Sequence, residues 1–222
     1  MRDLITVWVG RNAAATKFYI NADLAIQHSE LFSAALTTGS KAVEEQTVRL
    51  PDLSEHEAAV FGSFQSFLST GKVVSGQYEG NHEEDEEWDR LADSWLLGNS
   101  LLSSSFKDAV ADALVYKLTL EQSIPGDIYT DLYENSSDSS PIRKLMVDIA
   151  VHAWDEEEEF EKVDTDHHSA VHARFLRDVA VALFRVKHLS EAQQPKSPLT
   201  LESGCLYHEH GAEKPCYKTM FE

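Results

Sequence analysis

The chain has 222 residues, 42% of them hydrophobic, so it is long and apolar enough to bury a core and is not disordered throughout. Its 38 acidic residues outnumber 19 basic ones, and the formal net charge of -19 repels phosphate backbones and anionic lipid headgroups. We therefore expect no nucleic acid and no membrane surface among its partners.

The cysteine content and the absence of targeting segments indicate the compartment. No apolar run in the sequence approaches the roughly 20 residues that a helix needs to cross a bilayer. Residues 1–10 alternate apolar and polar types instead of forming a signal-peptide core. The two cysteines, Cys205 and Cys216, both lie near the C-terminus and cannot form the disulfide framework of a secreted domain. We expect a cytoplasmic and/or nuclear protein.

The first fifty residues predict a small sheet interrupted by helices. The aliphatic residues Ile5, Val7 and Val9 alternate with Thr6 and Trp8. After a glycine-containing turn comes the aromatic and β-branched run 18–20, and together the two segments predict a β-hairpin. Apolar residues at helical spacing over 24–36, around one polar break, predict two short helices. A third strand is predicted at residues 47–50.

A capping box opens the next predicted helix. The Ser54 hydroxyl and the Glu57 carboxylate are spaced to satisfy the free amide groups of a helix start. Apolar residues from Val60 to Leu68 lie along one helical face, and Gly71 stands where a left-handed residue closes a C-terminus. The pattern predicts one continuous helix over residues 54–71.

The middle of the chain predicts an acidic loop followed by two packed helices. Residues 76–87 are polar and end in five consecutive acidic side chains, which repel one another and favour a surface loop. Helical periodicity runs from Trp88 to Leu118 with a pause at residues 98–99. The four tryptophans are predicted to pack in the core or at domain junctions. They are Trp8, Trp88, Trp95 and Trp154.

Beyond residue 120 the pattern is helical only. Ser140 and Pro141 indicate an N-cap followed by a first-turn proline, and apolar stripes run over 142–153 and 171–186. A second acidic stretch lies between the stripes, and a proline-containing linker follows them. We therefore divide the chain into three parts. They are a domain at 1–118, a helical extension at 119–190, and a linker with a Cys/His tail at 191–222.

Several of these pieces occur in a recognisable order. They are residues 5–10 (Ile-Thr-Val-Trp-Val-Gly), Phe18, residues 29–32 (Ser-Glu-Leu-Phe), residues 48–51 (Val-Arg-Leu-Pro) and residues 64–71, which end in Ser-Thr-Gly. Over about residues 4–118 their order resembles the BTB/POZ family, specifically the compact BTB proteins of filamentous fungi. Two places depart from the family pattern: Asn21 and Ala22 replace a histidine-lysine pair, and Ser69 replaces a tyrosine.

The resemblance implies a fold and a class of function. The implied fold is a helix-rich α/β (α+β) domain with a three-stranded sheet flanked by helices, followed by an all-helical extension. The implied function is a protein-protein interaction module, not an enzyme: an adaptor for a cullin-type ubiquitin ligase, or alternatively an oligomerising, transcription-associated scaffold. Fold alone does not decide between these.

The resemblance also implies two kinds of protein partner. Cullin-binding relatives carry a hydrophobic-x-glutamate motif just before the third strand, and Val43 and Glu45 occupy that place, so both are predicted partner-binding residues. The chain begins at its first strand, without the N-terminal segment that some relatives exchange on dimerisation. We expect any homodimer to form through a hydrophobic seam between BTB domains.

One group of residues has the spacing of metal ligands. Cys205, His208, His210 and Cys216 place two thiols and two imidazoles within a dozen residues. Tetrahedral structural zinc favours such mixed donors, and a metal would supply the order that a short tail cannot gain from a core. A similar tail occurs in fungal BTB proteins. Two readings stay open: no cofactor, with free thiols in an exposed tail, or one structural zinc held by these four residues.

Sequence motifs assign no catalytic residue. The chain contains no Gly-x-Ser-x-Gly elbow, phosphate-binding glycine loop or dinucleotide fingerprint. Catalysis by Cys205 with His208 or His210 is a weaker hypothesis than the metal site, because a nucleophile needs a positioned base and this segment shows no scaffold. A small enzyme whose site is assembled from distant residues stays a further alternative.

Overall fold

The computed structural model is helix-rich with a small mixed sheet, which confirms the predicted α+β class. It describes residues 4–11, 15–37, 40–74, 86–121, 126–153, 169–187, 189, 197–198, 204–211 and 214–221. Among these residues, no helix has the length and apolar character needed to span a bilayer.

The chain forms two compact units. Unit 1 comprises residues 1–110 and 209–222, and unit 2 comprises residues 111–208. Helix α7 (Ser104–Glu121) begins in unit 1 and ends in unit 2. Unit 1 thus ends earlier along the chain than the predicted domain 1–118, and it also includes the last part of the predicted tail.

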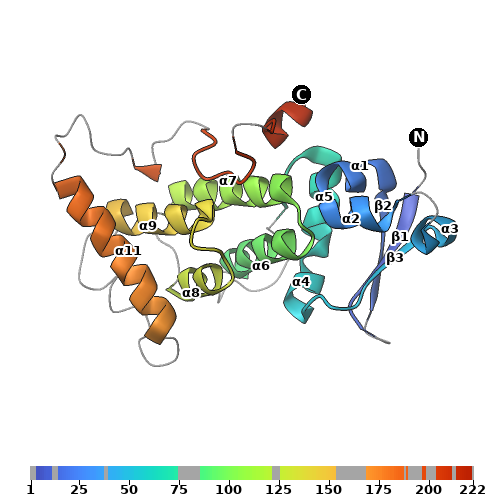
Figure 1. Ribbon diagram of the computed structural model, residues 1–222, viewed down its shortest axis with the longest axis horizontal. Coiled ribbons are helices and arrows are strands. Elements are labelled where there is room, and N and C mark those ends of the chain that lie inside the picture. The colour runs from blue at the N-terminus through green and yellow to red at the C-terminus, as the bar shows by residue number, and fades with distance from the viewer. Residues whose placement is uncertain are drawn as a thin grey trace. The chain divides into compact units, whose positions relative to one another are not determined.

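Unit 1 is built on a three-stranded sheet with the order β2-β1-β3 (Figure 1). Strand β1 (Leu4–Val9) pairs antiparallel with β2 (Thr16–Asn21) and parallel with β3 (Thr47–Leu50). The predicted hairpin and third strand are therefore present. Alternate residues of β1 are buried and form the core face of the sheet, as the period of two requires.

Six helices precede α7 among the described residues of unit 1. They are α1 (Ala22–His28), α2 (Glu30–Ala35), α3 (Lys41–Glu45), α4 (Glu55–Ala59), α5 (Phe61–Thr70) and α6 (Glu86–Ser100). Ser29 forms the polar break between α1 and α2, and its hydroxyl accepts a hydrogen bond from the Phe32 amide. Short helix α3 was not predicted from the sequence.

The helix predicted over residues 54–71 is in fact two helices. Its capping box and its left-handed Gly71 are both present, but Val60 leaves helical geometry at φ -96° and ψ 5°. Val60 and Phe61 are both buried, and the break lets these neighbours turn inward together. Burial of two adjacent side chains therefore overrides the continuity that the periodicity predicts.

Aromatic side chains make the core of unit 1. The ring of Phe64 lies 6.1 Å from that of Phe32 and 5.2 Å from that of Phe106. Trp88 and Trp95 of α6 are buried, as predicted. Trp8 is an exception, because it lies on the outer face of the sheet and is only half-buried. The predicted position of Trp154 falls outside the described residues.

The acidic loop predicted over 76–87 is shorter than expected at its end. Residues 75–85 lie outside the described part of the chain. Glu86 and Glu87 belong to the first turn of α6, where negative side chains interact favourably with the positive end of the helix dipole. The second acidic stretch and most of the predicted linker also fall outside the described residues.

The described residues of unit 2 form the second part of α7 and three further helices. They are α8 (Gly126–Glu134), α9 (Pro141–Ala153) and α11 (Ser169–Lys187). Pro141 opens α9 as predicted. Phe175 of α11 packs between Tyr129 and Tyr133 of α8, at ring distances of 5.0 and 5.2 Å.

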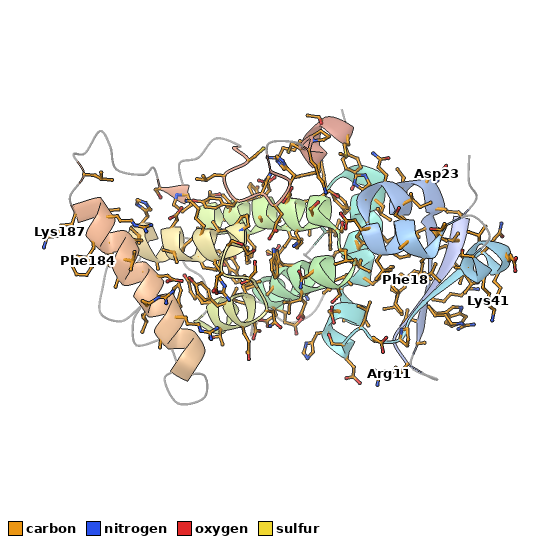
Figure 2. The ribbon with its side chains drawn as sticks, in the orientation of Figure 1. Arg11, Phe18, Asp23, Lys41, Phe184 and Lys187 are labelled. Carbon is orange, nitrogen blue, oxygen red and sulfur yellow. The ribbon has the colours of Figure 1, made fainter. Side chains whose placement is uncertain are left out.

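The apolar stripe predicted on α11 is buried only in part. Phe175 and Val179 of the stripe are buried, whereas Leu183 of the stripe is 44% exposed. Phe184, which lies beside the stripe, is 65% exposed. Figure 2 shows Phe184 projecting from the end of α11 together with Lys187. Helical spacing therefore predicted the helix correctly but overestimated the length of its buried face.

Candidate metal centre

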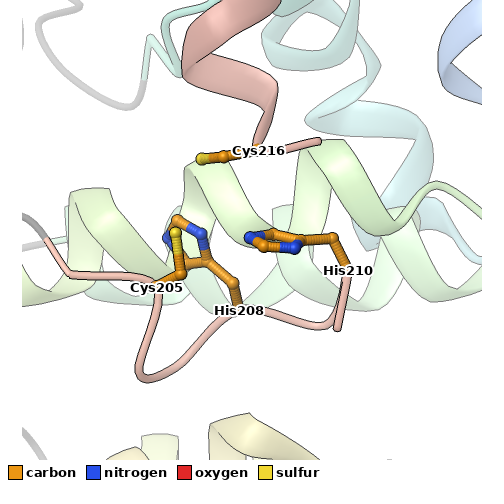
Figure 3. A group of neighbouring side chains, drawn as sticks. All are labelled: Cys205, His208, His210 and Cys216. Atoms are coloured by element: carbon orange, nitrogen blue, oxygen red, sulfur yellow. The ribbon is translucent and has the colours of Figure 1, made fainter. Parts of the chain in front are cut away.

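The structure brings the four predicted metal ligands together. The ligand atoms of Cys205, His208, His210 and Cys216 all lie within 4.8 Å of one another (Figure 3). The two cysteines are not joined in a disulfide. A tetrahedral zinc ion with bonds of about 2.0–2.3 Å separates its donors by roughly 3.3–3.8 Å. The four donor atoms are thus close to the spacing of such a site.

Local backbone structure places each ligand. The His208 amide donates a hydrogen bond of 3.2 Å to the Cys205 carbonyl and closes a turn that carries both residues. Gly211, at φ +65°, then adopts a left-handed conformation that favours glycine. Cys216 precedes the short helix η4 (Tyr217–Met220), and its carbonyl accepts hydrogen bonds from the Thr219 amide and hydroxyl.

A carboxylate supports the imidazole of His208. The side chain is 1% exposed, and its Nε2 lies 3.1 Å from Asp112 Oδ1 on α7. The carboxylate lies beside the edge of the ring that carries Nε2, which leaves Nδ1 on the other edge as the nitrogen for a metal. Metal-binding histidines commonly direct their second nitrogen to a carboxylate, which fixes both the tautomer and the ring orientation.

The tautomer of His210 follows from its own hydrogen bond. Its Nδ1 contacts the Gly211 carbonyl oxygen, which can only accept a hydrogen bond. The proton therefore resides on Nδ1, and Nε2 carries the lone pair that a metal ion needs. Each imidazole thus offers one ring nitrogen to the cluster, and zinc binds the neutral form of the ring.

The residue between the two histidines is anchored to α7. The Glu209 amide donates a hydrogen bond to the Asp108 carboxylate, and the Glu209 carboxylate lies 3.5 Å from Lys107 Nζ. Asp108 and Asp112 are four residues apart on α7, so they lie on one face of it. Their spacing was visible in the sequence, but nothing local linked them to a segment a hundred residues later.

Tyr207 holds the same turn through contacts with α9. Its hydroxyl donates a hydrogen bond of 2.9 Å to Asp148 on α9, and Lys144 lies 5.1 Å from its ring. Burial, and then the Asp148 carboxylate, raise the pKa of Tyr207 well above its ordinary value, so the hydroxyl stays protonated. Sequence reasoning found neither Tyr207 nor its partners.

The donor set fits a structural zinc ion. Two sulfur and two nitrogen donors make a complete tetrahedral shell of protein ligands. A zinc ion held by four protein side chains keeps no position for a catalytic water, so its role there is to order the chain. Cys205 and His208 would share the ion with His210 and Cys216.

The predicted partner-binding residues lie on a separate element. Val43 is 37% exposed on α3, and Glu45 forms an exposed ion pair of 3.3 Å with Lys41. The Ser40 hydroxyl caps the start of α3, and Gln46, at φ 49°, turns the chain into β3. Both residues thus project from a short capped helix at the edge of the sheet.

Comparisons with known proteins do not extend this picture. No protein-family model matches the chain, and no curated protein matches it significantly. The described geometry and the residues themselves are therefore the basis for the proposals that follow.

Proposed function

We propose that the protein is a protein-protein interaction module of the BTB/POZ type, acting as an adaptor or scaffold between other proteins. The observation that carries the proposal is the architecture of unit 1. A β-hairpin is followed by two short helices, a parallel third strand on the other side of β1, and a phenylalanine-rich helix. This order agrees with the fold that the sequence resemblance implies.

The surface of α3 supports an adaptor role. Val43 offers an exposed apolar side chain, and Glu45 lies two residues later on the same short helix. An apolar anchor beside a polar rim is the usual composition of a transient interface. The exposed pair between Glu45 and Lys41 contributes little stability, so the carboxylate can exchange its partner at small cost. We assign this surface to a cullin scaffold.

A scaffold without a ligase role is the second candidate function. Leu4 on β1 is 62% exposed and Tyr19 on β2 is 52% exposed. Apolar side chains beside the first strands favour self-association, because exposed apolar area is buried when a second copy covers it. This observation supports an oligomerising, transcription-associated module.

The experiment is titration calorimetry of the full chain with a cullin N-terminal domain, with light scattering to count subunits. We expect a Kd of roughly micromolar or tighter, the range of specific transient complexes. The double variant Val43→Ala with Glu45→Ala should bind at least about tenfold more weakly. Truncating an important interface residue commonly costs about 1–2 kcal/mol of binding free energy. Glu44→Ala, exposed on the same helix, is the matched control.

Each alternative result has a definite meaning. Equal affinity of the double variant and the parent would remove α3 from the interface. A dimer that does not bind the cullin domain would favour the scaffold without a ligase role. A monomer that binds no cullin domain would contradict both candidate functions.

A further inference from the structure

The outer face of the sheet carries a row of three side chains. Trp8 on β1 is paired in register with Lys17 on β2 and with Arg49 on β3. Residues paired in this way project from the same face, so the three side chains stand side by side across the sheet. We call Lys17, Trp8 and Arg49 the basic row.

Cation-π contacts hold the two basic groups beside the indole. Lys17 Nζ lies 5.7 Å from the centre of the Trp8 ring and 4.7 Å from that of Tyr19. Arg49 Cζ lies 5.9 Å from the Trp8 ring. Contacts of this length attract a cation to the ring face and leave its N–H donors available.

The two cations of the row lack a carboxylate partner within the part of the chain that the structure describes. Neither Lys17 nor Arg49 forms an ion pair or a hydrogen bond there. Other basic residues of unit 1 do form ion pairs. They are Arg11 with Asp52, Lys41 with Glu45, Arg90 with Glu86, Lys107 with Glu209 and Lys214 with Glu30.

The outward positions of the described strands carry no acidic side chain, although the net charge of the chain is -19. The outward positions on the described strands are Leu4, Thr6, Trp8, Lys17, Tyr19, Asn21, Thr47 and Arg49. In a chain with twice as many acidic as basic residues, this face is a local positive patch. Its charge is complementary to an acidic ligand.

A cavity adjoins the basic row. Its volume is about 470 Å³, and it is lined by Trp8, Gly10, Arg11, Ala15, Arg49 and Pro51. Arg11 is one of its lining residues and donates a hydrogen bond of 2.8 Å to the Pro51 carbonyl. An indole wall with arginines at the edge suits an apolar side chain flanked by negative charge.

We infer that this face binds an acidic segment of a partner protein in an extended conformation. Two of its carboxylates would pair with Lys17 and Arg49, and an apolar side chain between them would lie against Trp8. The backbones of β2 and β3 are roughly 10 Å apart, and alternate residues of an extended peptide are about 7 Å apart on one face. A peptide core of acidic-x-aromatic-x-acidic type therefore spans the row. Its two acidic residues lie two such steps apart, and the long side chains of Lys17 and Arg49 can reach outward to them.

Charge favours a peptide over single-stranded nucleic acid on this face. Aromatic and basic side chains on a sheet can also bind unpaired bases, but a nucleic acid carries a negative charge at every nucleotide. The net charge of -19 opposes such a polyanion, whereas two carboxylates match the two cations of the row. The inference goes beyond the proposed function and does not depend on α3.

The test uses fluorescence anisotropy with the full chain and a panel of dye-labelled nine-residue peptides. Each peptide has aspartate or glutamate at both acidic positions and phenylalanine or tryptophan between them. We expect binding that weakens as salt rises, because exposed charges are screened. Lys17→Gln with Arg49→Gln should weaken it at least about tenfold, as loss of charge-assisted hydrogen bonds does.

The control variant removes the same charge elsewhere. Lys72→Gln with Lys187→Gln changes two exposed basic residues that belong to no strand of the sheet. It should leave the affinity within about twofold, since neither residue belongs to the basic row and exposed charges are screened. Peptides with glutamine at the acidic positions should not bind. The Val43→Ala, Glu45→Ala variant should bind the peptides normally, which separates this inference from the proposed cullin surface.

Three results would overturn the inference. The first is that no peptide of the panel binds. The second is equal affinity of the Lys17→Gln, Arg49→Gln variant and the parent chain. The third is tighter binding of a thymidine oligonucleotide than of any peptide, with loss of that binding in the same variant, which would assign the face to nucleic acid.

Discussion

Replacing Gly71 with alanine tests how the C-terminal segment is held on unit 1. Gly71 closes α5 at φ +70°, in the left-handed region. A Cβ atom at this position would lie 2.6 Å from the ring of Phe221. Phe221 is close to the end of the chain and shares a segment with the candidate metal ligand Cys216. We therefore expect Gly71→Ala both to strain the backbone and to displace that segment.

The expected loss follows from two contributions. A left-handed alanine costs about 1–2 kcal/mol. Displacement of Phe221 also loses its contacts with His28 and Phe67, whose rings lie 5.3 and 5.5 Å away, and ring pairs of this kind contribute about 0.5–1.5 kcal/mol each. We expect the free energy of unfolding of unit 1 to fall by about 2–5 kcal/mol.

Urea unfolding followed by tryptophan fluorescence measures this loss. Three of the four tryptophans lie in unit 1, so the signal reports mainly on that unit. Gly62→Ala in the same helix is the control, because its Cβ would have nothing within 4 Å. That change should stabilise the helix by up to about 1 kcal/mol, since alanine favours helix over glycine.

A double-mutant cycle can refute the reasoning. If Phe221 lies against Gly71, the cost of Gly71→Ala must shrink in a Phe221→Ala background to about the backbone strain of 1–2 kcal/mol. An equal cost in both backgrounds would mean that the C-terminal segment does not pack on Gly71.

Two further predictions concern the metal centre and pH. Metal analysis of the purified protein should find one zinc per chain, lost together with thermal stability in Cys205→Ser with Cys216→Ser; absence of zinc with freely alkylated thiols would contradict the site. Burial lowers the pKa of His28 below its ordinary value of 6.5, so its stabilising contribution is complete above about pH 6.5 and is lost as pH falls through the lowered pKa. Urea unfolding from pH 8 to 5 should therefore show a decline in the free energy of unfolding that is shallower in His28→Gln than in the parent chain. An identical decline in both would exclude His28 as its source.

Local patterns in the sequence were sufficient for the elements whose cause is local. Alternation in β1 predicted a half-buried strand, because successive side chains point to opposite faces. The Ser54 capping box predicted a helix start, because the groups that satisfy one another are three residues apart. The four Cys/His residues were recognisable as a ligand set because they lie within a dozen positions.

Other features depend on contacts between distant parts of the chain. The break at Val60 and the exposed end of α11 are decided by which neighbours are available to bury a side chain. Asp112 supports His208 across nearly a hundred residues, and Trp8 meets Arg49 only because β3 pairs parallel with β1 in one register. Periodicity along one segment carries no information about its register against another. The sequence by itself therefore determined most of the elements and the candidate ligand set, whereas the tertiary structure decided the break at Val60, the support of the metal centre and the basic row.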